Sequence, residues 1–357
     1  MNRKKLLVSM MWLALLPLIF ESCEKSAVEN QQNGVALKQT QGTQLSLVGN
    51  ITLELPETGL GMVTSIAIVE DYIIILDNTT KKIEVFDIEG NYKWPIGSRG
   101  DGEGQYKIPT RLTVIPNTDQ MLIHDQGGKR QTLRFSIKGE FLGQLKRRRS
   151  MHQMLVSEDH NLIHTYVDRN RNGMLCVTSL DTGEDLAKFK VCDAQYGRLL
   201  STYRRLQGLA YDEERKIIYF ALPWEDKVMR IDLAAQEFLT PITISHPKFI
   251  SLDAEGKTES ELLKTKFSKL YGMHLLSSGD ILLRYMFGDS SRNTALILLS
   301  DLNMQTSIQE IKNELGYNIF TSHGMHIYKY SPPEGNEDTN GRIRVYRLID
   351  APESPIG

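Results

Sequence analysis

A repeat of short apolar strands and turns runs through most of this sequence of 357 residues. Its clearest copy places strands at Ser65–Ile68, Tyr72–Asp77, Ile83–Asp87 and Tyr92–Ile96, which makes four strands in about 35 residues. Five less regular copies follow, and the last is short of strands. Four strands repeated every 40–60 residues or so are typical of a β-propeller. The sequence therefore predicts an all-β fold, a six-bladed β-propeller of four-stranded antiparallel blades.

Two copies end on the same pattern, which predicts a common turn. Phe86–Tyr92 and Phe135–Phe141 each hold a glycine, Gly90 or Gly139, two residues before an aromatic residue. Glycine adopts the positive φ angle that tight turns between strands require. We expect each glycine to form the turn before the fourth strand of its blade.

Three further segments shape the prediction for the rest of the fold. Ser46–Leu55 alternates like a strand and belongs to no copy. We expect it to pair with the C-terminal strands, which would close the ring and remove an exposed edge. Glu259–Leu270 and Ser307–Leu315 place apolar residues at helical spacing and predict short helical insertions. These insertions would pack on the blades, or alternatively form a lid.

The N-terminus has the layout of an export signal. A basic start precedes the 15-residue apolar run Leu6–Phe20, which is too short to span a bilayer. The run leads to Ser22 and Cys23, as in bacterial lipoprotein signals whose cysteine is lipidated. We therefore predict a signal over residues 1–22 with lipid attachment at Cys23, the alternative being soluble export. Residues 23–44 are polar and predict a flexible tether, and residues 45–351 form the propeller.

The net charge bears on nucleic-acid binding, and the cysteine content bears on a possible disulfide. The net charge of −2 argues against a nucleic-acid partner, which would require a basic face. After Cys23 the chain holds two further cysteines, Cys176 and Cys192. An oxidising compartment permits a disulfide. The sequence allows either that bridge or two buried thiols.

A glycine-rich segment, Gly97–Tyr106, follows the Phe86–Tyr92 turn. Together the two segments resemble the NHL-like six-bladed β-propeller lipoproteins of anaerobic Gram-negative bacteria. The resemblance covers nearly the whole mature chain and is strongest over residues 45–145. It implies a cell-envelope lipoprotein, anchored to the outer membrane on its periplasmic or outer side, without an assigned reaction. Gln105 stands where that family more often has glutamate.

The candidate binding residues come from this segment and from a repeated triplet. Arg99, Asp101 and Tyr106 lie in the glycine-rich segment, while His274 and His326 each end a Gly-Met-His triplet. The segment is not predicted to be a phosphate cradle, because its glycine spacing differs and no Lys-Ser/Thr pair ends it. Histidines gathered at the propeller axis would be the alternative, a metal site. We predict no cofactor, no metal and no catalytic residue.

Three functions remain compatible with the sequence. The first is a monomeric, membrane-anchored, non-catalytic module that binds an envelope protein, peptide or glycan. The second is a metal-dependent hydrolase or lyase with its site on the axis. The third is a structural component of an envelope complex, which a broad apolar patch would favour.

Overall fold

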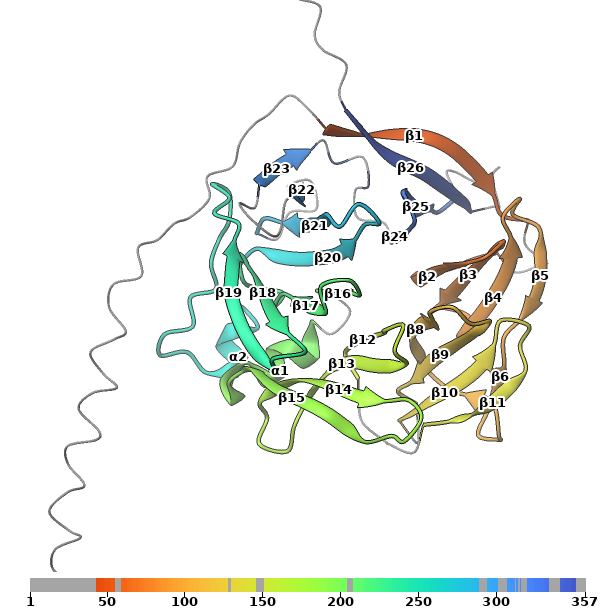
Figure 1. The fold of residues 1–357 in the computed structure, drawn as a ribbon, viewed down its shortest axis with the longest axis horizontal. Coiled ribbons are helices and arrows are strands. Elements are labelled where there is room, and N and C mark those ends of the chain that lie inside the picture. The colour runs from red at the N-terminus through yellow and green to blue at the C-terminus, as the bar shows by residue number, and fades with distance from the viewer. Residues whose placement is uncertain are drawn as a thin grey trace, which may run out of the picture. The chain divides into compact units, whose positions relative to one another are not determined.

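The computed structural model describes residues 43–54, 59–127, 130–145, 151–203, 208–288, 294–300, 307–311, 313, 315, 320–333 and 341–350. These residues form six four-stranded antiparallel sheets that surround a central axis as a ring (Figure 1). In each of the first five blades the strands follow one another outward from the axis in chain order. The predicted six-bladed β-propeller is therefore confirmed. The predicted signal, Cys23 and most of the tether lie outside the described residues.

The strands of the first three blades are regular in length. Blade 1 consists of β2 (Val63–Val69), β3 (Tyr72–Asp77), β4 (Lys82–Asp87) and β5 (Tyr92–Pro95). Blade 2 consists of β8 (Pro109–Ile115), β9 (Gln120–Asp125), β10 (Gln131–Ser136) and β11 (Phe141–Gln144). Blade 3 consists of β12 (Gln153–Val156), β13 (Asn161–Val167), β14 (Gly173–Ser179) and β15 (Asp185–Cys192).

The other three blades repeat this plan. Blade 4 consists of β16 (Leu209–Asp212), β17 (Ile217–Phe220), β18 (Lys227–Asp232) and β19 (Glu237–Thr243). Blade 5 consists of β20 (Lys269–Leu275), β21 (Ile281–Met286), β22 (Thr294–Ser300) and β23 (Ser307–Ile311). Blade 6 consists of β24 (Phe320–His323), β25 (His326–Ser331), β26 (Arg342–Asp350) and, from the N-terminal side, β1 (Thr43–Thr52).

Both ends of the propeller close the ring within blade 6. β1 pairs antiparallel with β26, from Thr43 opposite Asp350 to Thr52 opposite Arg342, with one irregularity between Leu47 and Gly49. The innermost strand β2 also contacts the innermost strands of blades 2 and 6 on either side. The predicted closure by the segment before the first repeat is therefore confirmed.

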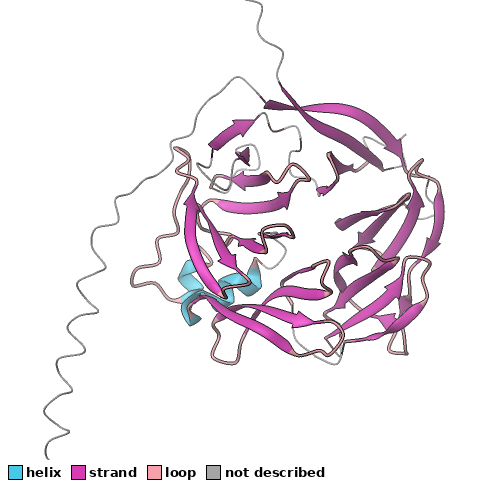
Figure 2. Ribbon diagram, in the orientation of Figure 1, coloured by secondary structure: helices cyan, strands magenta, loops and turns pink. Residues whose placement is uncertain are grey.

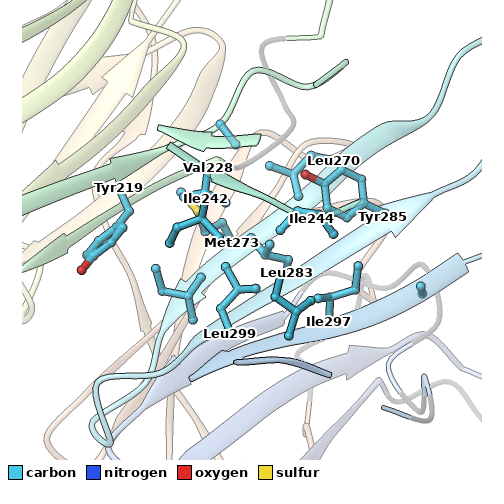
Figure 3. Packing of buried hydrophobic residues seen from close by; sticks show 14 of the residues in the cluster. Tyr219, Val228, Ile242, Ile244, Leu270, Met273, Leu283, Tyr285, Ile297 and Leu299 are labelled. Atoms are coloured by element: carbon cyan, nitrogen blue, oxygen red, sulfur yellow. The ribbon is translucent and has the colours of Figure 1, made fainter. Parts of the chain in front are cut away.

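The hydrophobic core lies between the blades. Side chains alternate between the two faces of a strand, so each blade sends one row toward each neighbouring blade. Figure 3 shows one such junction, where Tyr219 and Val228 of blade 4 meet Leu283 and Ile297 of blade 5. Further clusters fill the other five junctions. The fold is therefore held together by sheet faces packed against each other around the axis.

The two predicted glycine turns have the expected geometry. Gly90 has a φ angle of 98° and Gly139 one of 90°. The aromatic residue after each turn packs against the aromatic residue before it. The ring centroids are 5.8 Å apart for Phe86 and Tyr92, and 5.5 Å apart in the corresponding pair of blade 2. The shared pattern thus forms the turn before the outer strand of each of these two blades.

The helices differ from the prediction. Glu259–Leu270 contains only a short helix, α2 (Glu259–Leu262), which Thr258 caps. Ser307–Ile311 is the strand β23, so the predicted helix there is wrong. Its residues pair with β22 and complete blade 5. A run this short cannot reveal its period reliably, and the unpaired edge of β22 decides in favour of a strand.

A second helix, α1 (Ala194–Thr202), was not predicted. Figure 2 shows the two helices close together, and Leu199 of α1 and Leu262 of α2 join the apolar cluster between blades 3 and 4. The two helices therefore pack against blades 3 and 4. Over the described residues, no helix reaches the length and apolarity needed to cross a membrane.

Candidate functional site

The glycine-rich segment is built around a buried tyrosine. Two short parallel strands, β6 (Ser98–Arg99) and β7 (Gln105–Tyr106), bring its ends together between blades 1 and 2. Tyr106 is 1% exposed, and its hydroxyl donates a hydrogen bond of 2.7 Å to the carbonyl of Ile96. The predicted contact role of Tyr106 finds no support here, because its side chain offers no surface to a ligand. It instead anchors the loop to the core.

Gln105 fixes the tip of the same loop. Its Oε1 accepts a hydrogen bond of 2.8 Å from the Gly102 backbone N–H, and its Nε2 donates one of 3.2 Å to Ser98 Oγ. A Cβ atom on Gly100 would lie 2.0 Å from Gln105 Oε1, so a larger residue at this position would displace the Gln105 amide. Ser98 Oγ accepts from the Gln105 amide, whereas a glutamate here would have to accept from the Ser98 hydroxyl instead. The loop is thus a preorganised structure.

Arg99 and Asp101 are presented on this loop, as predicted for a surface site. Arg99 is exposed, and Asp101 is exposed and forms an ion pair of 2.7 Å between its Oδ2 and Lys107 Nζ. A binding role for the two residues stays a prediction. Two large apolar side chains are exposed at the adjacent starts of the inner strands: Met62, 46% exposed, precedes β2, and Ile108, 44% exposed, precedes β8.

The two candidate histidines occupy different strand positions. His274 lies on β20, the innermost strand of blade 5, and His326 begins β25, the second strand of blade 6. Burial, and to a lesser extent the cation of Arg284, lower the pKa of His274 to about 3, so the imidazole is neutral at physiological pH. Among the residues that the structure describes, no three His, Cys, Asp or Glu side chains gather in a way that could hold a metal ion.

The cysteine question is settled by the register of blade 3. Cys176 on β14 pairs with Lys188, whereas Cys192 on β15 pairs with Gly173. Both thiols are buried and no disulfide joins them, and burial raises the pKa of Cys192 to about 11. The two residues are therefore thiols without a disulfide.

Sequence reasoning did not identify two aspartates that hold the connectors. Asp125, at the end of β9, accepts backbone N–H groups of Ile108 at 2.7 Å, Gly127 at 3.0 Å and Lys107 at 3.2 Å. Asp77, at the end of β3, accepts those of Gly61 at 2.9 Å and Thr79 at 2.7 Å. The signal was present, because both aspartates end the second strand of a repeat. They fix the segment that enters the inner strand, and so the base of the glycine-rich loop.

Charge is distributed unevenly between the two ends of the inner strands. The turns between the first and second strands, here called the inner turns, carry eight acidic residues but only two basic ones, Arg215 and Lys216. The acidic residues are Glu70, Asp71, Asp119, Glu158, Asp159, Glu213, Glu214 and Asp280. At the opposite end lie the connectors between blades and the turns between second and third strands. Their described residues hold eleven acidic and eleven basic side chains.

Solved structures share this fold at low sequence identity. A protein of Bacteroides fragilis that is described as exported has a TM-score of 0.61 and 14% identity, covering 84% of this chain and 94% of that chain. A member of the duf4221 family from Bacteroides vulgatus has a TM-score of 0.61 and 12% identity, covering 88% of this chain and all of that chain (100%). At these identities the likeness concerns the fold.

Sequence comparison adds a relative and a family. "Protein brain tumor" of Drosophila melanogaster is 27% identical over 70 residues, which is 20% of this chain and only 7% of that protein's length. The family described as "6-bladed beta-propeller" matches residues 38–320. Because this match spans most of the 357 residues, the chain belongs to that family of six-bladed β-propellers.

Proposed function

We propose that this protein is a lipid-anchored β-propeller of the cell envelope that binds an envelope protein, peptide or glycan without transforming it. The anchor would be Cys23, and the binding surface would be the side of the propeller that carries the connectors, with Arg99 and Asp101 as contacts. The exported description of the Bacteroides fragilis protein supports an envelope location.

The observation that carries this proposal is where the chain enters the propeller. Thr43, the first residue of β1, lines one hollow together with Ile349 near the end of β26. Ser278 and Met325, from the inner turns of blades 5 and 6, line the same hollow. A tether that ends at Thr43 therefore joins the fold on the side of the inner turns. The connectors, with the glycine-rich loop, lie at the other end of the inner strands and would face away from the membrane.

The acidic inner turns affect how closely the propeller can approach the membrane. Bacterial membrane surfaces are anionic, and like charges repel over a Debye length of about 8 Å at physiological ionic strength. A flexible chain of the tether's length spans roughly 25 Å, which exceeds that distance. The acidic side would therefore stand off the membrane instead of adsorbing to it.

Anchoring is tested by replacing the predicted lipidated cysteine. We expect Cys23→Ser to move the protein from the membrane fraction to the soluble fraction and to abolish labelling by a palmitate analogue. Cys176→Ser is the matched control, because it removes a buried thiol without touching the predicted anchor. Unchanged fractionation of Cys23→Ser would refute the anchor.

Binding is tested with the mature chain from Ser26 onward on arrays of envelope glycans and peptides. We expect the double variant Arg99→Ala, Asp101→Ala to weaken any specific signal about tenfold, as removing contact residues at a binding surface does. Lys138→Ala, an exposed charge on an outer turn of blade 2, is the control and should bind as the wild type does. Equal signals from all three proteins would remove the loop from the binding surface.

A further inference from the structure

The junction between blades 2 and 3 is packed differently from the others. Among the residues that the structure describes, its cluster of buried apolar side chains has six members: Ile115, Leu122, Met151, Val156, Leu162 and Leu180. The clusters between blades 3 and 4 and between blades 4 and 5 have sixteen members each. Apolar side chains fill less of this junction, and polar ones take their place.

One of these polar groups holds the connector that enters blade 3. His124 is fully buried, its Nδ1 lies 3.0 Å from Thr132 Oγ1, and its Nε2 accepts the Met151 backbone N–H at 3.1 Å. Because Nε2 accepts, the ring proton is on Nδ1 and is donated to Thr132. This hydrogen bond fixes the backbone of Met151, whose side chain belongs to the apolar cluster of the junction.

A second group of hydrogen-bonded polar side chains lies on blade 3, at the same junction with blade 2. The Thr178 hydroxyl donates to Asp185 Oδ1 at 2.9 Å, and its oxygen lies 3.3 Å from His164 Nε2. Since the hydroxyl proton goes to Asp185, the oxygen accepts from His164. Lys188 Nζ lies 2.8 Å from Asp185 Oδ2 and balances its charge. The other polar neighbour of this oxygen is Cys176 Sγ at 3.6 Å. A thiol is only a weak donor, so a ligand hydroxyl can take its place at the second lone pair of Thr178.

Beside His164 and Thr178 the junction contains a cavity of about 150 Å³. Its floor is buried and mostly apolar, with Met151, Leu162 and Leu180 beside the ring of His164. Gln144 and Thr182, which are exposed, lie at its rim. The cavity therefore extends from the interior to the surface, so a ligand could enter without opening the blades.

We propose that this cavity is a binding site for a small, uncharged, mainly apolar molecule of the size of a single aromatic ring that carries one hydroxyl group. A protein cavity of about 150 Å³ with apolar walls accommodates a benzene-sized molecule. Apolar walls disfavour an ion, which would lose its hydration. A ligand hydroxyl can donate to the oxygen of Thr178 at the polar end. The site requires neither the lipid anchor nor ligand binding by the glycine-rich loop.

The probes are phenol, benzene and benzoate, added to the mature chain and followed by ligand-observed NMR. We expect phenol to bind best, benzene less well, and benzoate at least about tenfold more weakly than phenol. Absence of phenol and benzene binding up to about 10 mM would overturn the proposal, as would benzoate binding equal to that of phenol.

Two variants assign the binding to this cavity. Leu145→Trp adds volume to the wall and should weaken phenol binding at least about tenfold, whereas Leu233→Trp, at a half-buried leucine packed against the blade 3–4 cluster, should not. Thr178→Val keeps the side-chain volume and should reduce phenol binding toward that of benzene. Circular dichroism checks each fold, and Leu145→Phe replaces Leu145→Trp if the latter is unfolded. Wild-type affinity in the folded wall variant would refute the site.

Discussion

A chain that begins at Leu53, and so lacks β1, is expected to unfold at least about 10 °C below a chain that begins at Gly42, or not to fold at all. β1 pairs with β26 from Thr43 to Thr52 and buries Leu45. Hydrogen bonds that contribute about 0.5–1.5 kcal/mol each are lost with it. For a domain of this size each kcal/mol corresponds to roughly 2–4 °C in Tm. The exposed edge of β26 would also promote aggregation.

Two point variants distinguish the loss of packing by β1 from the effect of shortening the chain. Leu45 is 7% exposed and Leu47, two residues further along the same strand, is 50% exposed. Leu45→Ala should therefore lower the free energy of unfolding by about 2–3 kcal/mol, and Leu47→Ala by less than about 0.5 kcal/mol. Calorimetry of all four proteins provides the measurement. Equal Tm values for the chains beginning at Gly42 and Leu53 would show that the ring does not depend on its closing strand.

The ring was predictable because blades 1 and 2 follow every local rule at once. Their strands alternate or are wholly apolar, and glycines stand where φ is positive, as at Gly90 and Gly139. β1 was predictable for a similar reason, since an alternating strand outside the repeat must pair with the blade that lacks one. Agreement between local pattern and global fold is what makes such a sequence interpretable.

The predictions that were wrong or incomplete concern segments whose structure depends on residues distant in the sequence. Ser307–Ile311 forms a strand because β22 offers it an edge, which its own five residues do not reveal. The inner strands β12 and β24 are four residues each and were missed. Cys176 and Cys192 could be separated only once the register of β14 and β15 was known.

The candidate site was predictable only in part. Alternate glycines indicated an ordered loop, and Arg99 and Asp101 are exposed on it. The burial of Tyr106 was not visible, because an aromatic residue after a loop can be either a contact or an anchor. The cavity between blades 2 and 3 had no sequence signal either, since its walls come from separate strands and from the turn after Ser179.

The two connector-holding aspartates lead to the second large effect. Asp125→Ala is expected to lower the free energy of unfolding by about 3 kcal/mol or more, because it leaves the backbone N–H groups of Lys107, Ile108 and Gly127 without their acceptor. The bond from Gly127 is buried and those from Lys107 and Ile108 are partly buried, and a buried donor left unsatisfied costs about 1–3 kcal/mol. The free energy of unfolding of Asp125→Asn should lie between those of the wild type and Asp125→Ala, because the amide retains only one of the two accepting oxygens.

Asp101→Ala is the matched control, since Asp101 contacts the side chain of Lys107 whereas Asp125 contacts its backbone. An exposed ion pair contributes about 0–1 kcal/mol, so urea unfolding should barely distinguish Asp101→Ala from the wild type. A loss in Asp125→Ala no greater than in Asp101→Ala would contradict the role assigned to the buried carboxylate. The expected contrast follows from the same physical rule that shapes the loop: a charge stabilises the fold where it replaces water for backbone donors, and very little where water remains.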